Sequence, residues 1–164
     1  MRLPPIQVLA AETCTLTSLD ISHNEVSGAV LSRAVRTNAS LTSLDFRHNP
    51  VDDNALWVLG GLLLDDECTC RLGYLRTYAF DVTEGSTQLS LRDTPIAIGA
   101  ARLLIGVIKF NRTVESLDLS NVGLVLQAAQ TLAKAIAANT TLTKLDISRN
   151  PLSDVSNYSE TELE

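Results

Sequence analysis

The sequence predicts an α/β fold built from repeated units, each a short strand followed by a turn and a helix. A nine-residue phrase, LTSLDISHN at residues 16–24, returns as LTSLDFRHN, STQLSLRDT, VESLDLSNV and LTKLDISRN, which begin at residues 41, 86, 114 and 142. Apolar residues at helical spacing follow most of these phrases. Such a recurring segment is a supersecondary unit that cannot bury its apolar face alone, so neighbouring units are expected to stack.

The composition is typical of one soluble domain with an aliphatic core. The chain has 164 residues, of which 45% are hydrophobic and only 4% aromatic. We expect the repeats to occupy residues 1–152 and a polar, acidic tail to occupy residues 153–164. The formal net charge of −6 argues against a nucleic-acid partner, because no basic stripe is present to neutralise phosphates.

The units differ in completeness. In the first, Leu19 and Ile21 alternate as in a strand with one buried face, and residues 28–36 follow at helical spacing. The last three phrases are separated by a strict period of 28 residues, and the helical segments between them align residue for residue. The fifth unit, residues 142–152, has its strand but no helix after it.

The helix of the second unit is expected over residues 54–64. Asp52 or Asp53 would be its N-terminal cap, with carboxylates in the favourable first turn. Gly60 and Gly61 lie inside this helix, where each costs about 1 kcal/mol relative to Ala. We therefore expect a weakened helix, or one that bends or ends early at the glycines.

The repeat loses its register after the second helix. The third phrase begins 45 residues after the second, about 17 more than the later period, so we expect an irregular insertion near residues 68–85. Leu72 and Leu75 have the spacing of a degenerate strand within it. Long irregular segments in compact domains are usually functional or disordered, and aromatic residues are common interface anchors. Three of the seven aromatic residues lie in the insertion, either as interface anchors or as packing against the sheet edge: Tyr74, Tyr78 and Phe80.

The phrase LxxLxLxxN, followed two residues later by an aliphatic residue, resembles the leucine-rich repeat; these residues are Val26, Val51, Ile96, Leu124 and Leu152. The 28-residue period and the alanine-rich last helix are similar to the ribonuclease-inhibitor-like subtype, which is shared by intracellular proteins. The resemblance covers residues 16–152, although Thr94 and Val122 replace the phrase's Asn and Ser86 replaces its first Leu. It implies a solenoid, a short horseshoe arc with parallel strands on the concave face and helices on the convex face. It also implies that the concave face binds other proteins.

Candidate binding residues follow from the strand period of two, which turns the side chains between the buried leucines towards the concave face. Aspartates recur in the centre of this face, and we interpret them as an acidic ladder for a basic peptide or protein surface. The alternative is that they are consensus residues of the repeat and are simply solvated. Charged residues that vary between units are better candidates for selectivity. The predicted protein-binding residues are Asp20, Asp45, Arg47, His48, Tyr74, Tyr78, Phe80, Arg92, Asp118, Lys144, Asp146 and Arg149.

The sequence favours a non-enzymatic function with no cofactor or metal. No nucleophile elbow, phosphate-binding loop or zinc-protease motif is present, and Cys68 and Cys70 lack a second ligand pair. Sequons at Asn38, Asn111 and Asn139 occupy one repeat position, which repetition explains better than glycosylation. No secretory signal or membrane-spanning run is visible, which favours an intracellular, cytoplasmic location without direct membrane insertion.

Three functional hypotheses follow. The first is a protein–protein interaction module or scaffold that uses the concave face and the insertion at 68–85. The second is a structural subunit, or a fragment, held inside a larger complex through its open ends, because exposed terminal repeats reduce solubility. The third, which rests only on similarity to one member of the family, is a regulator of a small GTPase.

Overall fold

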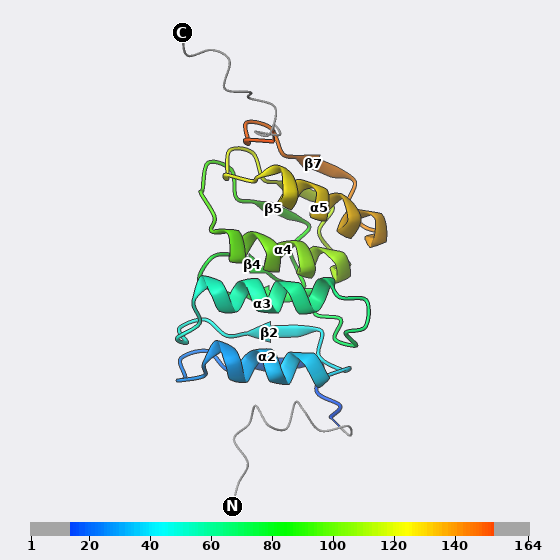
Figure 1. Cartoon of the computed structure of the whole chain (residues 1–164). Coiled ribbons are helices and arrows are strands. Elements are labelled where there is room, and N and C mark those ends of the chain that lie inside the picture. Colours follow the sequence, from blue (N-terminus) through cyan, green and yellow to red (C-terminus); the bar gives the residue numbers. More distant parts are fainter. Residues whose placement is uncertain (1–13, 153–164) are drawn as a thin grey trace, which may run out of the picture.

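The computed structural model describes residues 14–152. The predicted tail at 153–164 and the first thirteen residues of the predicted repeat domain lie outside the described residues. In Figure 1 the helices are stacked in chain order on one side of the molecule, with the strands behind them. The helices are α2 (Gly28–Thr37), α3 (Asp53–Leu64), α4 (Ile98–Phe110) and α5 (Leu126–Ala138).

The strands form two sheets. The first has the order β1 (Ser18–Asp20), β2 (Ser43–Asp45), β3 (Tyr74–Arg76) and β4 (Asp81–Val82), and the second has the order β5 (Gln88–Ser90), β6 (Ser116–Asp118) and β7 (Lys144–Asp146). Every pairing is parallel except that of β3 with β4. The fold is therefore mixed α/β with parallel strands, as the sequence predicts.

Positions that recur from unit to unit hold neighbouring units together. Asn49 accepts a hydrogen bond from the amide of Val26 at 3.0 Å, and its side-chain nitrogen donates to the carbonyl of Ile21 at 2.9 Å. A second asparagine follows each of three helices, and its side chain accepts from the amides two and three residues on. Two of these sequon residues, Asn38 and Asn111, are buried at 1% and 0% exposure, so both serve in packing.

The segment near 68–85, expected as an irregular insertion, contains a regular repeat strand. β3 pairs with β2 in the repeat register, with Leu75 opposite Leu44. The chain then turns back as β4, antiparallel to β3, and reaches β5 without forming a helix. The break in the period thus comes from a unit that has a strand and a hairpin but no helix of its own.

The curved, continuous sheet of a horseshoe arc is not seen: the sheet is divided between β4 and β5 and is not curled (Figure 1). Neighbouring strands are about 4.8 Å apart, whereas packed helices are about 8–10 Å apart. An array with one strand per helix is therefore longer on its helix side and bends with the sheet on the inside. β3 and β4 lengthen the strand side without adding a helix. The two sides therefore become more equal in length, which opposes the bend.

Helix α3 begins and ends close to the predicted bounds. Asp52 is its N-cap, and its carboxylate accepts from the amide of Ala55 at 2.9 Å. The helix runs without interruption through Gly60 and Gly61, contrary to the expected bend or early end. A Cβ at Gly60 would lie 2.6 Å from the backbone of α4, so close contact between the helices explains this glycine. Within residues 14–152, none of the helices has the length and apolar character needed to cross a membrane.

Candidate functional site

The strand face is formed by side chains that lie between the buried leucines. Four aspartates on this face share one local role: each carboxylate accepts a hydrogen bond from the amide two residues later, where the strand ends. The partners are Ser22 for Asp20 (2.8 Å), Arg47 for Asp45 (3.1 Å), Ser120 for Asp118 (3.0 Å) and Ser148 for Asp146 (2.9 Å). This bond satisfies a backbone donor at the end of each strand, which is a physical reason for the aspartate in the phrase.

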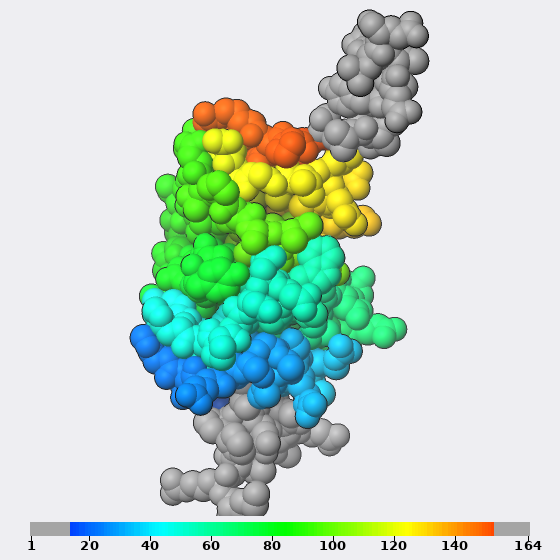
Figure 2. All heavy atoms as spheres, turned by 60° about the vertical axis from the view of Figure 1, so that its left-hand side comes forward, coloured from blue at the N-terminus to red at the C-terminus, as the bar shows by residue number. Residues whose placement is uncertain are grey.

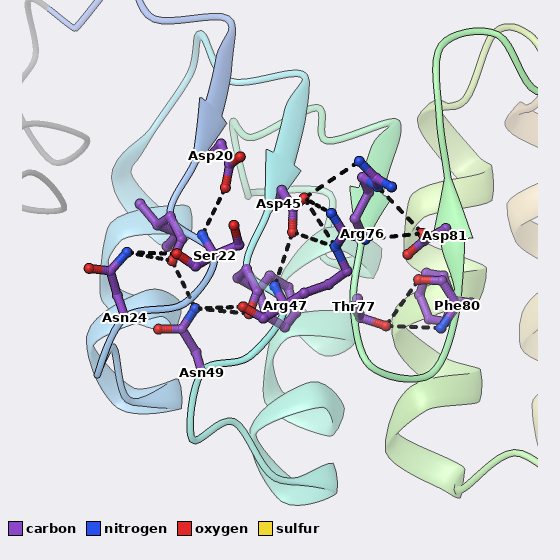
Figure 3. A network of polar contacts seen from close by, with 12 residues as sticks. Asp20, Ser22, Asn24, Asp45, Arg47, Asn49, Arg76, Thr77, Phe80 and Asp81 are labelled. Atoms are coloured by element: carbon purple, nitrogen blue, oxygen red, sulfur yellow. Dashed lines mark hydrogen bonds and ion pairs between the residues drawn. The ribbon is translucent and has the colours of Figure 1, made fainter.

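Four charged side chains form the first charge network, which joins β2, β3 and β4 (Figure 3). Asp45 lies at its centre, with Arg47 Nη2 at 2.7 Å and Arg76 Nη1 at 3.7 Å from its Oδ2. Asp81 closes the network, with Arg76 Nε at 3.4 Å and Arg47 Nη1 at 3.8 Å. The two arginines are thereby held between carboxylates of β2 and β4, the strands on either side of β3.

Asp45 is 8% exposed and remains charged because of its partners. Burial alone would raise its pKa, but hydrogen bonds from the Arg47 side chain and amide, with the nearby Arg76 charge, bring the pKa below its ordinary value. The side chains of Arg47 and Arg76 are 30% and 43% exposed, so they retain a free side towards solvent.

The second charge network consists of Asp118 on β6, Asp146 on β7 and Arg92, which lies just after the end of β5. Arg92 Nε lies 2.8 Å from Asp118 Oδ2, and its Nη2 lies 3.3 Å from Asp146 Oδ2. Hydrogen bonds from the Ser120 hydroxyl and amide, followed by Arg92, lower the pKa of Asp118 to about 2. The central aspartate of this network is more exposed than that of the first, since the side chain of Asp118 is 21% exposed and that of Asp45 is 9% exposed.

The aspartates predicted as an acidic ladder are therefore mostly paired with arginines. Of the four, Asp20 alone makes no ion pair with a residue in the described part of the chain, and it is exposed. Lys144 on β7 is also exposed. The strand face thus has a mixed pattern of positive and negative groups.

Two further predicted residues, His48 and Arg149, lie in the turn after a strand. The residues at this position have a positive φ of 54° to 58°: His23, His48, Asp93, Asn121 and Arg149. Two pairs of these side chains contact each other between units: the rings of His23 and His48 stack at 4.0 Å, and Asn121 donates to Asp93 at 2.8 Å. In Figure 2 the side of the molecule where the helices begin faces the reader, and successive units follow one another in chain order.

The three aromatic residues near 68–85 occupy different environments. Tyr74 is half-buried and lies opposite Ser43 in the sheet register, while Tyr78 is 60% exposed in the turn between β3 and β4. Phe80 is only 4% exposed and belongs to the core. The hydroxyl of Thr77 accepts hydrogen bonds from the amides of Ala79 and Phe80 and fixes this turn (Figure 3). Phe80 therefore does not contribute to the exposed surface.

Arg76 and Asp81 are site residues that sequence reasoning missed. Their placement depends on β3 and β4, which the broken period hides. The signal that could have found Arg76 was the spacing of Leu72 and Leu75. Placing this strand in the repeat register, with Leu75 opposite Leu44, puts Arg76 opposite Asp45.

Metal binding and thiol chemistry find no support in the described residues. Residues 14–152 contain no group of three or more metal-ligand side chains. Cys68 and Cys70 are buried at 7% and 0% exposure, and burial raises the pKa of Cys70 to about 11. A thiol in this environment stays protonated and acts as a small apolar side chain.

Comparisons with known proteins concern the repeat alone. A family model described as "Leucine Rich repeat" matches residues 13–29, 37–56 and 138–156. No curated protein sequence matches the chain. Among solved structures, one match is "Leiomodin-1 Actin-Binding Site 2 (ABS2)", with a TM-score of 0.34 and 13% identity over 92% of this chain and 64% of that chain. The chain thus spans less than two thirds of that structure, and so low a TM-score does not establish a common fold.

Proposed function

We propose that this leucine-rich repeat protein is a non-enzymatic protein-binding module that receives its partner on the strand face. Leucine-rich repeats generally mediate protein–protein interaction, and the family is typically non-enzymatic. Repeat arrays offer extended surfaces for such binding. The question for this chain is which of its surfaces a partner contacts.

The observation that carries the proposal is the way in which arginines are held on the strand face. Arg47 and Arg76 lie between Asp45 and Asp81, and Arg92 bridges two aspartates of the second sheet. Ordering these long side chains before binding reduces the entropy that a partner must overcome. Arginine and tyrosine are also enriched among residues that dominate binding energy.

The partner we propose has a surface of mixed charge. Its carboxylates would contact the free sides of Arg76 and Arg92, and a basic group would contact Asp20. Tyr78, at 60% exposure, would extend the contact beyond the strands. The basic partner surface predicted from the aspartates is thus retained for the part of the face near β1.

The proposal is tested by pull-down and quantitative binding with the variant Arg76→Glu/Arg92→Glu. Both side chains are more than 40% exposed, so the change has little effect on packing, but the new carboxylates face the aspartates of the two networks. Urea unfolding is therefore measured as well, and binding is compared only between proteins that remain folded. Arg33→Glu/Arg36→Glu on the exposed face of α2 is the matched control with the same change in charge. We expect that a partner which binds the wild type and the control does not bind the Arg76→Glu/Arg92→Glu variant, the strand-face variant. A partner retained at full affinity by that variant would show that the strand face is not its binding surface.

We further propose that the array is a short solenoid of the ribonuclease-inhibitor-like subtype and functions inside the cell. The subtype is supported by the offset of 28 residues between paired positions of neighbouring strands, as in the pairing of Gln88 with Ser116 and of Ser116 with Lys144. The buried, protonated thiol of Cys70 is compatible with a reducing compartment.

A second candidate function is that of a subunit in a larger complex. Leu16 and Leu145 are 43% and 40% exposed, whereas the equivalent residues Leu41 and Leu117 in the interior are at most 1% exposed. Apolar side chains at the open ends of the described array favour a covering partner. Light scattering of the full chain distinguishes the two: self-association supports the subunit hypothesis, and a stable monomer in dilute solution counts against association of copies.

A further inference from the structure

The helix side of the molecule contains an apolar groove that the strand-face function does not use. The groove has a volume of about 200 Å³ and lies over α4, between α3 and α5. Trp57, Ile98, Arg102, Val125 and Ala128 are among its lining residues. Ile98 and Val125 are 54% and 40% exposed, and concave apolar surfaces of this kind usually mark a binding site.

The groove exists because α5 packs on α4 less closely than α3 does. At the α3–α4 junction, a Cβ added to Gly60 of α3 would lie 2.6 Å from the α4 backbone. A Cβ added to Gly99 of α4 would lie 1.9 Å from the α3 backbone. Aligning the helices by their first residues places Ile105 and Gln127 at the equivalent positions of the α4–α5 junction. Ile105 and Gln127 both line the groove. The α4–α5 junction thus has side chains at the two positions where the α3–α4 junction has glycines.

The closed junction also shows which chemical group the open one lacks. Asp53 of α3 accepts hydrogen bonds from the amides of Gly99 and Ala100 at the start of α4, at 3.0 and 2.9 Å. The residue of α4 equivalent to Asp53 is Ile98, and within the described residues no side chain caps the start of α5. A carboxylate fits such a position, because the amides at a helix N-terminus favour negative charge.

Arg102 adds a positive charge to the groove. Its guanidinium lies 4.0 Å from the centre of the Trp57 ring and donates to the Trp57 carbonyl at 3.3 Å. It forms no ion pair with residues 14–152. The groove therefore fits an acidic segment that also carries an aromatic or aliphatic side chain.

We propose that residues 153–164 of this chain occupy the groove and pair a carboxylate with Arg102 and the start of α5. The segment has the sequence SDVSNYSETELE, with four carboxylates, no cation, and three large apolar or aromatic side chains at Val155, Tyr158 and Leu163. This composition matches both the charge and the apolar walls of the groove.

The described chain ends close to the loop that leads into α5. The side-chain oxygen of Asn150 accepts hydrogen bonds from the amides of Val122, Gly123 and Leu124 at 2.9 to 3.1 Å, directly before Val125 in the groove wall. Twelve further residues span up to about 40 Å when extended. The segment after Leu152 can therefore cross the start of α5 and enter the groove.

The test uses the full chain. Trp57 reports on the groove, because it is the only tryptophan in the sequence and lines the groove. The tail-neutral variant replaces the four carboxylates of the segment, with Asp154→Asn, Glu160→Gln, Glu162→Gln and Glu164→Gln. The control changes the charge equally at exposed acids elsewhere, with Glu25→Gln, Glu67→Gln, Glu84→Gln and Glu115→Gln. The readouts are acrylamide quenching of Trp57 fluorescence and the amide NMR signals of Gln127 and Ala128.

We expect the tail-neutral variant to show increased quenching and shifted signals for both amides, at every protein concentration, while the control matches the wild type. Arg102→Gln also uncovers the Trp57 ring, so it is judged on the amide signals alone: it should give the same shifts of Gln127 and Ala128 and leave no further effect of tail neutralisation on them. Unchanged quenching and unchanged amide signals in the tail-neutral variant would overturn the proposal. Differences that appear only as the protein concentration rises would also overturn it, since they would assign the groove to a second copy of the chain.

Discussion

The α3–α4 and α4–α5 junctions are built from equivalent parts of the repeat and yet pack differently. At the first, Gly60 and Gly99 let the helix backbones touch, and Asp53 caps the next helix. At the second, Ile98 replaces the carboxylate and larger side chains replace the glycines, which leaves a groove. A few side chains at fixed repeat positions thus decide whether a junction is closed or open.

The strand side shows a related contrast between its two charge networks. Asp45, at the centre of the first network, has a side chain that is 9% exposed and contacts two arginines. In the second network one arginine serves two aspartates, whose side chains are 21% and 40% exposed. Both networks order arginines, but only the first is centred on a nearly buried aspartate, while Asp81 and Arg76 at its edge are as exposed as the second network.

The largest effect is expected from filling the glycine contact of the closed junction. Gly60→Leu places side-chain atoms where the α4 backbone lies and should lower the free energy of unfolding by about 3 kcal/mol or more, because two backbones must separate. Gly85→Leu is the control, since a Cβ at Gly85 meets nothing within 4 Å, and it should change stability by less than about 0.5 kcal/mol. Urea unfolding measures both. Equal stabilities of the two variants would show that the junction is not closely packed.

Removing the cap of α4 should have the next largest effect. Asp53→Ala deletes the acceptor for the amides of Gly99 and Ala100 and should cost about 1–2 kcal/mol. Glu84→Ala, at an exposed turn, is the control for loss of one carboxylate. Thermal and urea unfolding should separate the two variants, and an Asp53→Ala protein as stable as the control would contradict the capping role.

Supplying a carboxylate to the open junction should have a smaller effect of opposite sign. Ile98→Asp, introduced into the tail-neutral variant, should raise the free energy of unfolding by about 0.5 kcal/mol, because the new carboxylate would face the amides at the start of α5. The gain is expected to be smaller than the loss from Asp53→Ala, because Gln127 holds α5 away from α4. The same urea titration measures it, and a loss of stability would mean that the two junctions are not equivalent.

The smallest effect concerns acid stability of the second charge network. The pKa of Asp118, about 2, is below its ordinary value of 3.8, so its stabilising contribution is complete above about pH 4 and is lost as the pH falls towards 2. Ser120→Ala removes the hydroxyl that lies 2.7 Å from Asp118, the largest cause of the lowered pKa. The variant should therefore lose less stability than the wild type between pH 4 and pH 2 in chemical unfolding. An identical loss in the two proteins would contradict this assignment.

Much of the fold was predictable because the repeat carries its own signal. The leucines that alternate in each phrase indicated the strands, and the helical spacing of residues 28–36 indicated α2. Asp52 or Asp53 was expected as the cap of α3, and Asp52 is the one found. Gly60 was misinterpreted as a weak point, since a glycine that permits contact with another helix has the same local pattern as one that ends a helix.

The candidate site was less predictable because it depends on contacts between units. The positions of the strand-face aspartates follow from the strand period, but their pairing with arginines does not. Arg92 precedes Asp118 by 26 residues and Asp146 by 54, and the role of Arg76 required the register of β3. The groove escaped prediction altogether, because an apolar residue such as Ile98 in a helix pattern is expected to be buried.

Amide hydrogen exchange compares the two junctions most directly, in the full chain and in its tail-neutral variant. The amides of Gly99 and Ala100 should exchange slowly in both proteins, because Asp53 of the chain itself caps them. The amides of Gln127 and Ala128 should exchange slowly in the full chain and quickly in the variant. Rapid exchange of Gly99 and Ala100, or exchange of Gln127 and Ala128 that is the same in both proteins, would contradict the contrast between a closed junction and one filled by the tail.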